Sequence, residues 1–409
     1  MKEIKLPKNW KIEKVSNIAN LIRGINYKKE TASNNSFFES LPILRANNIN
    51  GDLNFEDLVY VPKSLIKSEQ LIKKDDIIFA MSSGSKHLVG KTAVAKNDFK
   101  GSYGAFCALL RINEGINKKY VSYIFKGNNY RKLISEIAKG TSINNLKREH
   151  ILDFEFPLPP LETQQAIVSK IEELFSELDK GIAELKTAQQ QLKTYRQSVL
   201  KSAFEGKLTN ENVKDGELPD GWEIKTFDEI IEISKEKHKP VINEFKFYIG
   251  LEHIEKNIGK LTSHCGIEEI KTIKSKFKSG EILYGKLRPN LNKVYLAREE
   301  GVCSTDILVL KTRKNCNAKF LTQLMLGSDF VNTMSENTNG VNLPRVSTKF
   351  ILEYKINLPP IEEQHQIVQE IESRLSVADK MEQSIQESLQ KAEALRQSIL
   401  KKAFCGELV

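Results

Sequence analysis

Two stretches of the chain place apolar residues at alternating steps of three and four. This seven-residue period is typical of the seam of a coiled coil. The seam positions are Leu161, Val168, Ile171, Phe175, Leu178, Ile182, Leu185 and Leu192 in the first stretch, and Ile361, Val368, Ile371, Leu375, Ala378, Ile385, Leu389 and Ala392 in the second. The pattern predicts one long helix in each stretch.

A Pro-Pro pair precedes each predicted helix, and a glycine, Gly206 or Gly406, follows it. Proline suits the first turn of a helix, and glycine is common just past the last. A helix of about 43 residues is roughly 65 Å long and cannot bury its apolar stripe alone. We expect the two helices to pack antiparallel against each other; a coiled coil between two chains is the alternative.

The two helices belong to an internal repeat at an offset of 200 residues. "LPPLETQQAIV", from Leu158, matches "LPPIEEQHQIV", from Leu358, and "RQSVLKSAFEGKL" matches "RQSILKKAFCGEL". About 20 of the last 50 aligned pairs are identical without a gap, which indicates duplication. A weaker echo, "LPKNW" at Leu6 and "LPDGW" at Leu218, predicts that the closing "CGELV" lies near the opening "LPKNW". The fold would then be pseudo-circular with a pseudo-two-fold axis.

The segments between the helices show short β-favouring runs broken by polar loops. "DDIIFAM" and "GAFCALLRI" in the first segment correspond to "GEILYGKL" and "TDILVLKT" in the second. We therefore expect an α+β protein with two globular, mainly-β domains of antiparallel sheet, at residues 1–157 and 210–357. Two long antiparallel coiled-coil helices, at residues 158–209 and 358–409, would separate them.

Positive charge is concentrated in the first globular segment. The formal net charge is +9, and residues 1–150 carry 26 Lys and Arg against 14 Asp and Glu. Residues 151–210 carry 7 against 9, residues 211–357 carry 23 against 21, and residues 358–409 carry 6 against 9. A basic segment of this kind suits a surface that faces phosphates, although a solvated basic face is the alternative.

Polar loops supply the candidates for contact with DNA. Arg and Lys can contact guanine, Asn can contact adenine, and Ser can contact bases or phosphates. Most candidates lie in a strand-to-strand loop of each globular segment or just before each long helix. They are Arg23, Lys28, Arg45, Asn47, Asn48, Ser82, Ser83, Ser85, Lys86, His87, Lys91, Thr141, Asn144, Asn145, Lys147, Lys286, Arg288, Asn290, Asn292, Lys293, Asn342 and Arg345.

One stretch, "GSKHLVGKT", resembles a phosphate-binding P-loop. Five residues rather than four separate Gly84 from Gly90, and the corresponding "GKLRPNLNKV" carries no such motif. We interpret both stretches as loops between strands. An enzyme that uses this loop for nucleotides is the alternative.

No other pattern indicates chemistry in this chain. The five cysteines form no C-x-x-C pair, and His264, Cys265, Cys303 and Cys316 do not match standard zinc spacings. Methyltransferase and nuclease motifs are missing. We predict no catalytic residue, no bound cofactor and no metal site. Reduced cysteines, no apolar run of about 18 residues and no signal sequence lead us to expect a cytoplasmic protein.

The whole arrangement resembles the specificity subunit of type I restriction–modification enzymes. The resemblance rests on two globular segments introduced by "LP-x-x-W" and two helices that open with "LPP-[LI]-E-x-Q" and close with "RQS-[VI]-L-K-x-A-F-x-G-x-L". "YIGLEHIE" and "LYGKLRPNLNKV" are also similar to target-recognition segments of that family, whereas the first segment matches less closely.

The resemblance implies a function and a set of partners. Each globular segment would be a target-recognition domain for one half of an interrupted site in double-stranded DNA. The helices would set the spacing and dock two modification subunits, which methylate adenine at N6. S-adenosylmethionine would bind those subunits, and ATP and magnesium would serve the restriction subunits. A coiled-coil scaffold without DNA recognition is the alternative.

Overall fold

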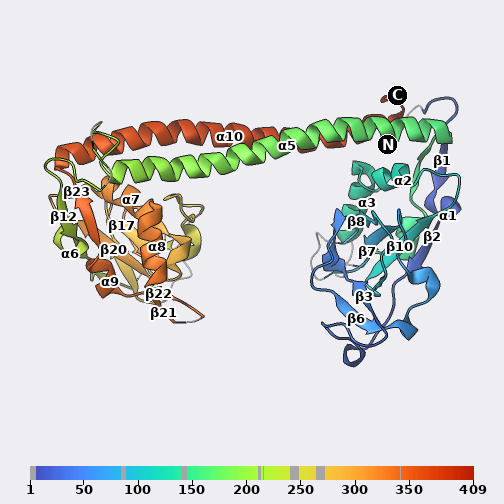
Figure 1. The fold of residues 1–409 in the computed structure, drawn as a ribbon, viewed down its shortest axis with the longest axis horizontal. Helices are drawn as coiled ribbons and strands as arrows, with labels where there is room; N and C mark the ends of the chain where they lie inside the picture. The colour runs from blue at the N-terminus through green and yellow to red at the C-terminus, as the bar shows by residue number, and fades with distance from the viewer. Residues whose placement is uncertain are drawn as a thin grey trace. The chain divides into compact units, whose positions relative to one another are not determined.

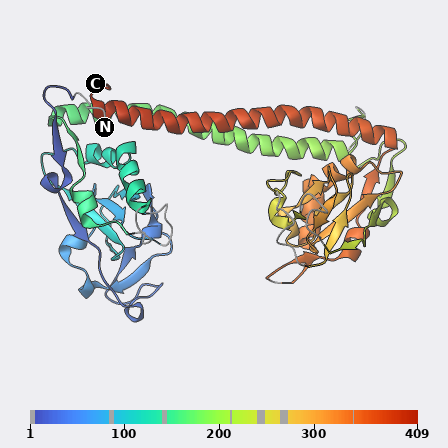
Figure 2. The same cartoon turned by 180° about the vertical axis from the view of Figure 1, so that it is seen from behind.

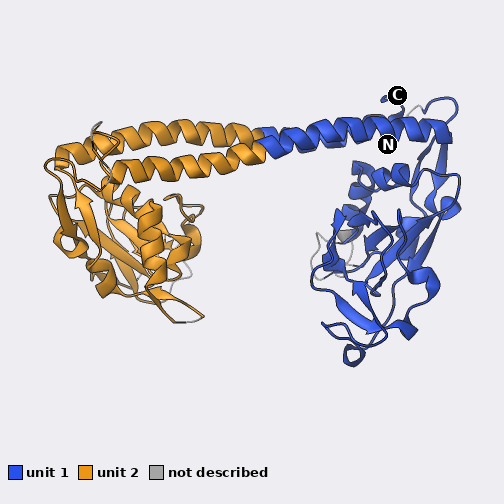
Figure 3. Ribbon diagram, viewed as in Figure 1, with its two compact units in different colours: residues 1–184, 388–409 blue, residues 185–387 orange. Residues whose placement is uncertain are grey.

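The computed structural model describes residues 6–83, 89–139, 145–210, 213–214, 216–239, 248–263, 272–340 and 342–409. The chain divides into two compact units, residues 1–184 with 388–409 and residues 185–387 (Figure 3). Each unit holds one globular module and one part of each long helix, α5 (Leu161–Phe204) and α10 (Ile361–Cys405) (Figure 1). The helices are therefore shared between the units.

The module of the first unit contains a four-stranded antiparallel sheet in the order β2-β10-β7-β8. These strands are β2 (Ala19–Arg23), β7 (Ile77–Ala80), β8 (Thr92–Val94) and β10 (Cys107–Ile112). Its remaining strands are β1 (Lys11–Lys14), β3 (Ser40–Leu44), β4 (Ile49–Asn50), β5 (Asp52–Leu53), β6 (Val59–Pro62), β9 (Ser102–Tyr103) and β11 (Glu155–Leu158). Its helices are α1 (Val15–Ile18), α2 (Lys118–Ile124), α3 (Asn128–Lys139) and α4 (Arg148–Leu152).

The module of the second unit repeats this plan with the sheet order β13-β20-β17-β18. These strands are β13 (Ile231–Ile233), β17 (Ile282–Gly285), β18 (Val294–Leu296) and β20 (Ile307–Thr312). The others are β12 (Glu223–Thr226), β14 (Lys237–His238), β15 (Tyr248–Ile249), β16 (Lys274–Phe277), β19 (Gly301–Cys303), β21 (Thr338–Asn339), β22 (Arg345–Val346) and β23 (Lys355–Leu358). Its helices are α6 (Phe227–Ile230), α7 (Ala318–Leu326), α8 (Ser328–Glu336) and α9 (Thr348–Leu352).

The α+β fold and the antiparallel helices predicted from the sequence are confirmed. The four β-favouring runs quoted from the sequence form β7, β10, β17 and β20. β7 pairs antiparallel with β10, and β17 pairs antiparallel with β20. Two parallel pairs, β3 with β9 and β15 with β19, are additions that the sequence did not indicate. Within each unit the parts of α5 and α10 run side by side in opposite directions, as both views show (Figures 1 and 2).

Both long helices enter the hydrophobic core of each module. In the first unit, Ile167 and Ile171 of α5 and Leu400 of α10 join the cluster that contains Tyr120. In the second unit, Ile367 and Ile371 of α10 and Leu200 of α5 occupy the equivalent cluster. Most predicted seam positions are buried or half-buried, but the first, Leu161, is 41% exposed because it lies at the first residue of α5. The duplicated helices thus anchor the modules as well as pair with each other.

The glutamine of the "LPP-x-E-x-Q" phrase joins each long helix to its module. Gln164 is buried, accepts a hydrogen bond from the Asn117 backbone N–H at 2.9 Å and donates one to the Pro159 carbonyl at 2.8 Å. Gln364 accepts from the Asn317 N–H at 2.7 Å. It also donates to the carbonyls of Asn315 and Pro359, at 3.0 and 2.8 Å. A buried amide with both ends bonded holds the helix start against the residue before α2 or α7.

An arginine–aspartate pair connects α5 to α10 in each unit. In the second unit Arg196 donates to Asp379 at 2.7 Å, and in the first Arg396 donates to Asp179. The two pairs are related by the 200-residue offset. The Arg396 guanidinium also lies 4.8 Å from the ring centroid of Phe175. The duplication therefore preserves the polar contacts between the helices as well as the apolar seam.

The predicted closeness of the two chain ends is confirmed within the first unit. Gly406 has a φ of +76° and caps α10, and a Cβ built there would lie 2.4 Å from Cγ of Pro7 and 3.5 Å from the Trp10 ring. Gly206 makes the same approach to Pro219 and Trp222 in the second unit, at 2.3 and 3.5 Å. The "LP-x-x-W" phrase thus packs against a helix end in both units, once through a continuous chain and once across the termini.

We expect Gly406→Ala to destabilise the first unit by about 1–3 kcal/mol, since the substitution strains a positive φ and collides with Pro7. Gly181→Ala is the matched control, because a Cβ on this glycine inside α5 would meet nothing within 4 Å. Alanine there is expected to raise stability by up to about 1 kcal/mol. Urea denaturation measures both, and equal effects of the two substitutions would contradict the packing described for Gly406.

Candidate nucleic-acid interface

Three loops of the second module meet beside the end of its main sheet. The backbone N–H of Lys286, just after β17, donates to the carbonyl of Asp306, just before β20, at 3.0 Å. The Arg288 N–H donates to the Pro344 carbonyl at 2.8 Å, and the Val346 N–H donates to the Lys286 carbonyl at 3.1 Å. The strand-to-strand loop, the loop before β20 and the segment before α9 therefore form one cluster, which we call the three-loop cluster.

The first module contains the same three-loop cluster. The N–H groups of Met81 and Ser82, just after β7, donate to the Phe106 carbonyl at 2.8 and 3.1 Å. The Leu146 N–H donates to the Met81 carbonyl at 2.7 Å, and Ser82 and Asn145 form a β-bridge, as Leu287 and Arg345 do in the second module. The structure thus brings together two sets of predicted residues that are about 60 positions apart in each half of the sequence.

The side chains on this shared backbone differ between the modules. In the second module Asp306 binds Arg345 through two hydrogen bonds, from Nε at 3.0 Å and from Nη2 at 3.2 Å. The hydrogen bond from Arg345 holds the pKa of Asp306 below its ordinary value, so the carboxylate is charged at neutral pH. Arg288 is exposed and held at a φ of +51°, and the predicted residues Asn290 and Asn342 are also exposed.

In the first module the three-loop cluster borders a hollow of about 500 Å³. Phe106, the counterpart of Asp306, lies at its rim with 68% of its surface exposed. The polar side chains that line the hollow are Arg23, Asn26, Ser82, Asn145 and Arg148. An exposed ring among amides and guanidinium groups can contact base edges or stacked bases.

Two predicted DNA contacts are corrected to structural roles. Asn48 is 1% exposed. Its side-chain oxygen Oδ1 accepts a hydrogen bond from the Arg45 backbone N–H at 2.9 Å, and its side-chain nitrogen Nδ2 donates to the Glu56 carbonyl at 2.9 Å. Asn292 is also 1% exposed and donates to the Met325 carbonyl at 3.1 Å. Neither side chain reaches the surface where a duplex could contact it.

Besides Arg345, three predicted cationic residues make hydrogen bonds within the protein. Lys91 donates to the Asn50 side chain at 2.6 Å, and Arg45 donates to the Asp57 carbonyl at 2.7 Å. Lys293 donates to the Ile254 carbonyl. Lys28, Asn47 and Lys147 are exposed, and Ser83 is half-buried after β7. DNA contact at these positions stays a prediction. Ser85, Lys86, His87, Thr141 and Asn144 lie outside the described residues.

The stretch that resembles a P-loop connects two strands. β7 and β8 pair antiparallel on either side of it, whereas a P-loop leads from a strand into a helix. The corresponding stretch connects β17 to β18 in the same way. Each stretch therefore lies between two paired strands, as interpreted from the sequence.

Phe106, Asn26, Arg148 and Asp306 lie at the three-loop clusters but were not among the residues predicted from the sequence. Phe106 and Asp306 are 200 residues apart and directly precede the strands β10 and β20. At this aligned position the first half of the chain has an aromatic residue and the second half has an acid. Such a difference between the repeats could have marked the position as a candidate for contact with different bases. The contact between the three loops could not be predicted, because the loops are far apart along the chain and no local sequence pattern marks it.

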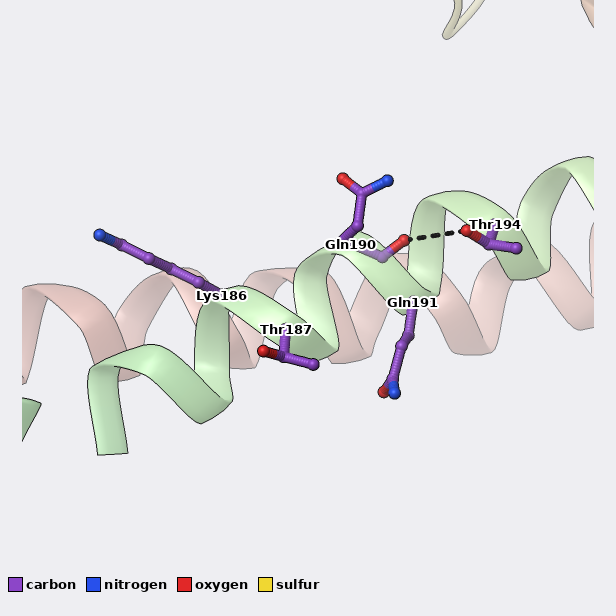
Figure 4. Close-up of a pocket in the computed structure, with 5 residues that line it drawn as sticks. All are labelled: Lys186, Thr187, Gln190, Gln191 and Thr194. Carbon is purple, nitrogen blue, oxygen red and sulfur yellow. Dashed lines mark hydrogen bonds between the residues drawn. The ribbon is translucent and has the colours of Figure 1, made fainter. Parts of the chain in front are cut away.

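A hollow on the long helix α5 is lined by side chains that do not converge. A hollow of about 490 Å³ on α5 is lined by Lys186, Thr187, Gln190, Gln191 and Thr194 (Figure 4). The Thr194 hydroxyl donates to the Gln190 carbonyl at 3.3 Å, and the labelled side chains point in different directions, so they form no convergent site. Among the described residues, no group of three or more His, Cys, Asp or Glu side chains is arranged to hold a metal ion. None of the helices described is long and apolar enough to span a bilayer.

The chain is similar to known proteins over nearly its full length. A family profile described as "Type I restriction modification DNA specificity domain" matches residues 7–187 and 219–391. The EcoKI specificity subunit of a type I restriction enzyme from Escherichia coli K12 is 33% identical over 99% of this chain and 90% of its own. The StySPI specificity subunit of Salmonella potsdam is also 33% identical, again over 99% and 90%.

Solved structures share the fold. A chain from a structural study of complex assembly in the type I R-M system superimposes with a TM-score of 0.73 at 17% identity, covering 98% of this chain and 99% of that chain. The HsdS subunit of Thermoanaerobacter tengcongensis gives a TM-score of 0.53 at 18% identity, covering 99% of both chains. With two profile matches and relatives above 30% identity, the chain belongs to the family of type I restriction–modification specificity subunits, which recognise DNA sequence through two target-recognition domains.

Proposed function

We propose that this subunit reads one interrupted, asymmetric site in double-stranded DNA, with one half-site for each module. The observation that carries the proposal is the three-loop cluster, which recurs in both modules on the same backbone with different side chains. Equivalent scaffolds suit equivalent tasks, and different side chains suit different bases. Two half-sites about one helical turn apart, roughly 34 Å, present the same groove on one face of a duplex.

The charge distribution supports contact between the modules and DNA. The excess of Lys and Arg lies in residues 1–150, whereas residues 151–210 and 358–409, which contain the long helices, carry a small excess of Asp and Glu. Phosphate contacts require cations, so the modules rather than the helices are the parts expected to bind the duplex.

We further propose that α5 and α10 dock two modification subunits. Tyr195 and Leu395 support this, because they occupy equivalent positions on the two helices and are 43% and 52% exposed. Large apolar side chains exposed at related positions suit two copies of one partner. The duplication would then present one partner with two similar surfaces.

The chemistry of the complex is assigned to the partners. The modification subunits would bind S-adenosylmethionine and methylate adenine at N6, and restriction subunits would use ATP and magnesium. This chain would contribute no catalytic group and no cofactor, and it would act in the cytoplasm, where the DNA is. Its own part is to place the modification subunits on a chosen sequence.

A map of N6-methyladenine across the genome of the source cell, with and without this gene, tests the proposal. We expect one interrupted, asymmetric motif to disappear when the gene is deleted. DNA binding by the complex with the modification subunits should also weaken steeply with salt, since each phosphate contact releases a counterion. A complex that assembles but shows no sequence preference and little salt dependence would instead support a coiled-coil scaffold.

A further inference from the structure

The pair formed by Asp306 and Arg345 lies where backbone hydrogen bonds join the loops of the second three-loop cluster. Arg345 begins β22, where its backbone pairs with Asn339 of β21 and bridges to Leu287 after β17. β21 and β22 form a hairpin at the side of the module remote from α10 (Figure 1). The Arg345 side chain therefore starts from a fixed point on an outward-facing element.

Stability alone does not explain this pair. The side chains of Asp306 and Arg345 are 28% and 42% exposed. Ion pairs at that level of exposure contribute little to folding, typically below about 1 kcal/mol. The effect of the pair is instead geometric, because two parallel hydrogen bonds fix the plane and direction of the guanidinium.

The hydrogen bonds of Arg345 do not use all the donors of its guanidinium. Asp306 takes the edge formed by Nε and Nη2. Nη1 makes a third, longer hydrogen bond to the Leu343 carbonyl at 3.4 Å. Each terminal nitrogen carries two hydrogens, so Nη1 and Nη2 each keep one N–H group for a further acceptor. An edge with two parallel N–H groups matches O6 and N7 of guanine in the major groove.

The two positions of this ion pair carry different residue types in the first module. Asp306 and Arg345 correspond to Phe106 and Asn145, which lie on the same backbone but carry an exposed ring and an amide. A structural requirement common to both modules would keep the same chemistry in both. A position that reads bases would differ, because the half-sites differ.

We propose that Arg345, oriented by Asp306, reads a guanine in the half-site of the second module. This inference rests on the proposed function, because it requires the second module to contact bases. Arg345 is the specificity-determining residue, and Asp306 is a positioning residue that acts through it. The corresponding position of the first module contacts a different base pair through Phe106 and Asn145.

Sequence selection from a random duplex pool, with the full chain assembled with its modification subunits, tests the inference. For Arg345→Ala we expect discrimination at one guanine position to fall by about 5- to 150-fold, while the other half-site is unchanged. Arg345→Lys keeps the charge but loses the paired donors, so it should lose the same discrimination with little loss of overall affinity. Asp306→Asn should give a partial loss at the same position. Lys349→Ala, which removes an exposed charge from nearby α9, is the matched control.

The outcomes separate this inference from the proposed function. An unchanged motif for Arg345→Ala, or a change at a position other than guanine, would overturn the inference while the bipartite motif of the wild type upholds the function. Uniform weakening on all sequences by Arg345→Ala, rescued by Arg345→Lys, would assign Arg345 to a phosphate and also overturn it. A wild-type complex that selects no motif would refute both. Phe106→Ala should alter only the other half-site.

Discussion

Replacing Gln364 with alanine is expected to lower the free energy of unfolding of the second unit by about 3 kcal/mol. The substitution removes one buried amide and leaves three backbone groups without their partner: the Asn317 N–H and the carbonyls of Asn315 and Pro359. An unsatisfied buried group costs about 1–3 kcal/mol, and the cavity adds to that cost, although water can restore part of it. Urea denaturation of the full chain measures the loss.

Gln165→Ala is the control for this prediction. Gln165 is one residue beyond Gln164 in the equivalent phrase and is exposed on α5, so its loss should change stability by less than about 0.5 kcal/mol. Gln164→Ala should fall between the two, because Gln164 makes two of the hydrogen bonds that Gln364 makes. Similar denaturation curves for Gln364→Ala and Gln165→Ala would show that the glutamine of the phrase does not anchor the helix.

The parts of the fold that depend on local pattern were predictable from the sequence. The seven-residue period and the gapless repeat predicted both long helices and their antiparallel pairing. The echo of "LP-x-x-W" predicted that "CGELV" lies near "LPKNW", where Gly406 approaches Pro7. Leu161 was assigned wrongly to the buried seam, since periodicity does not distinguish the first turn of a helix from its interior. The role of Gln164 was out of reach, because its partner Asn117 is 47 residues away in the chain.

The candidate site was predictable as loops but not as individual side chains. An asparagine on the surface and one that caps a turn use the same donor and acceptor, so the sequence could not separate the exposed Asn145 from Asn48, which the structure buries. Phe106 and Asp306 become candidates only because each lies where three loops meet. That meeting is a tertiary contact with no periodic signal, and it decides which side chains face a partner.

Removing seven residues from the middle of each long helix is expected to shorten the preferred spacer between the half-sites while leaving both half-sites unchanged. Suitable segments are 184–190 of α5 and 384–390 of α10, which lie between the two arginine–aspartate pairs. Seven residues correspond to two helical turns, so the apolar seam keeps its phase. Both ion pairs can form again, because each joins residues at the same end of the helix pair.

The expected size of the change follows from helix and duplex geometry. Seven residues shorten a helix by about 10.5 Å, which equals about three base pairs at 3.4 Å each. Three base pairs also rotate one half-site by roughly 100° around the duplex, so we expect the spacer to shorten by up to about three base pairs and affinity to fall roughly tenfold or more. The methylation motif of cells that carry the double deletion reports spacer and half-sites together.

A deletion in one helix alone provides the contrast. Removing only 184–190 shifts one helix by two turns against the other, so Arg196–Asp379 and Arg396–Asp179 can no longer form together. That variant should lose stability and methylation without a new defined spacer, whereas the double deletion should keep a defined motif. If the double deletion retained the original spacer, the helices would not determine the distance between the half-sites, and that distance would have to be set by the modification subunits.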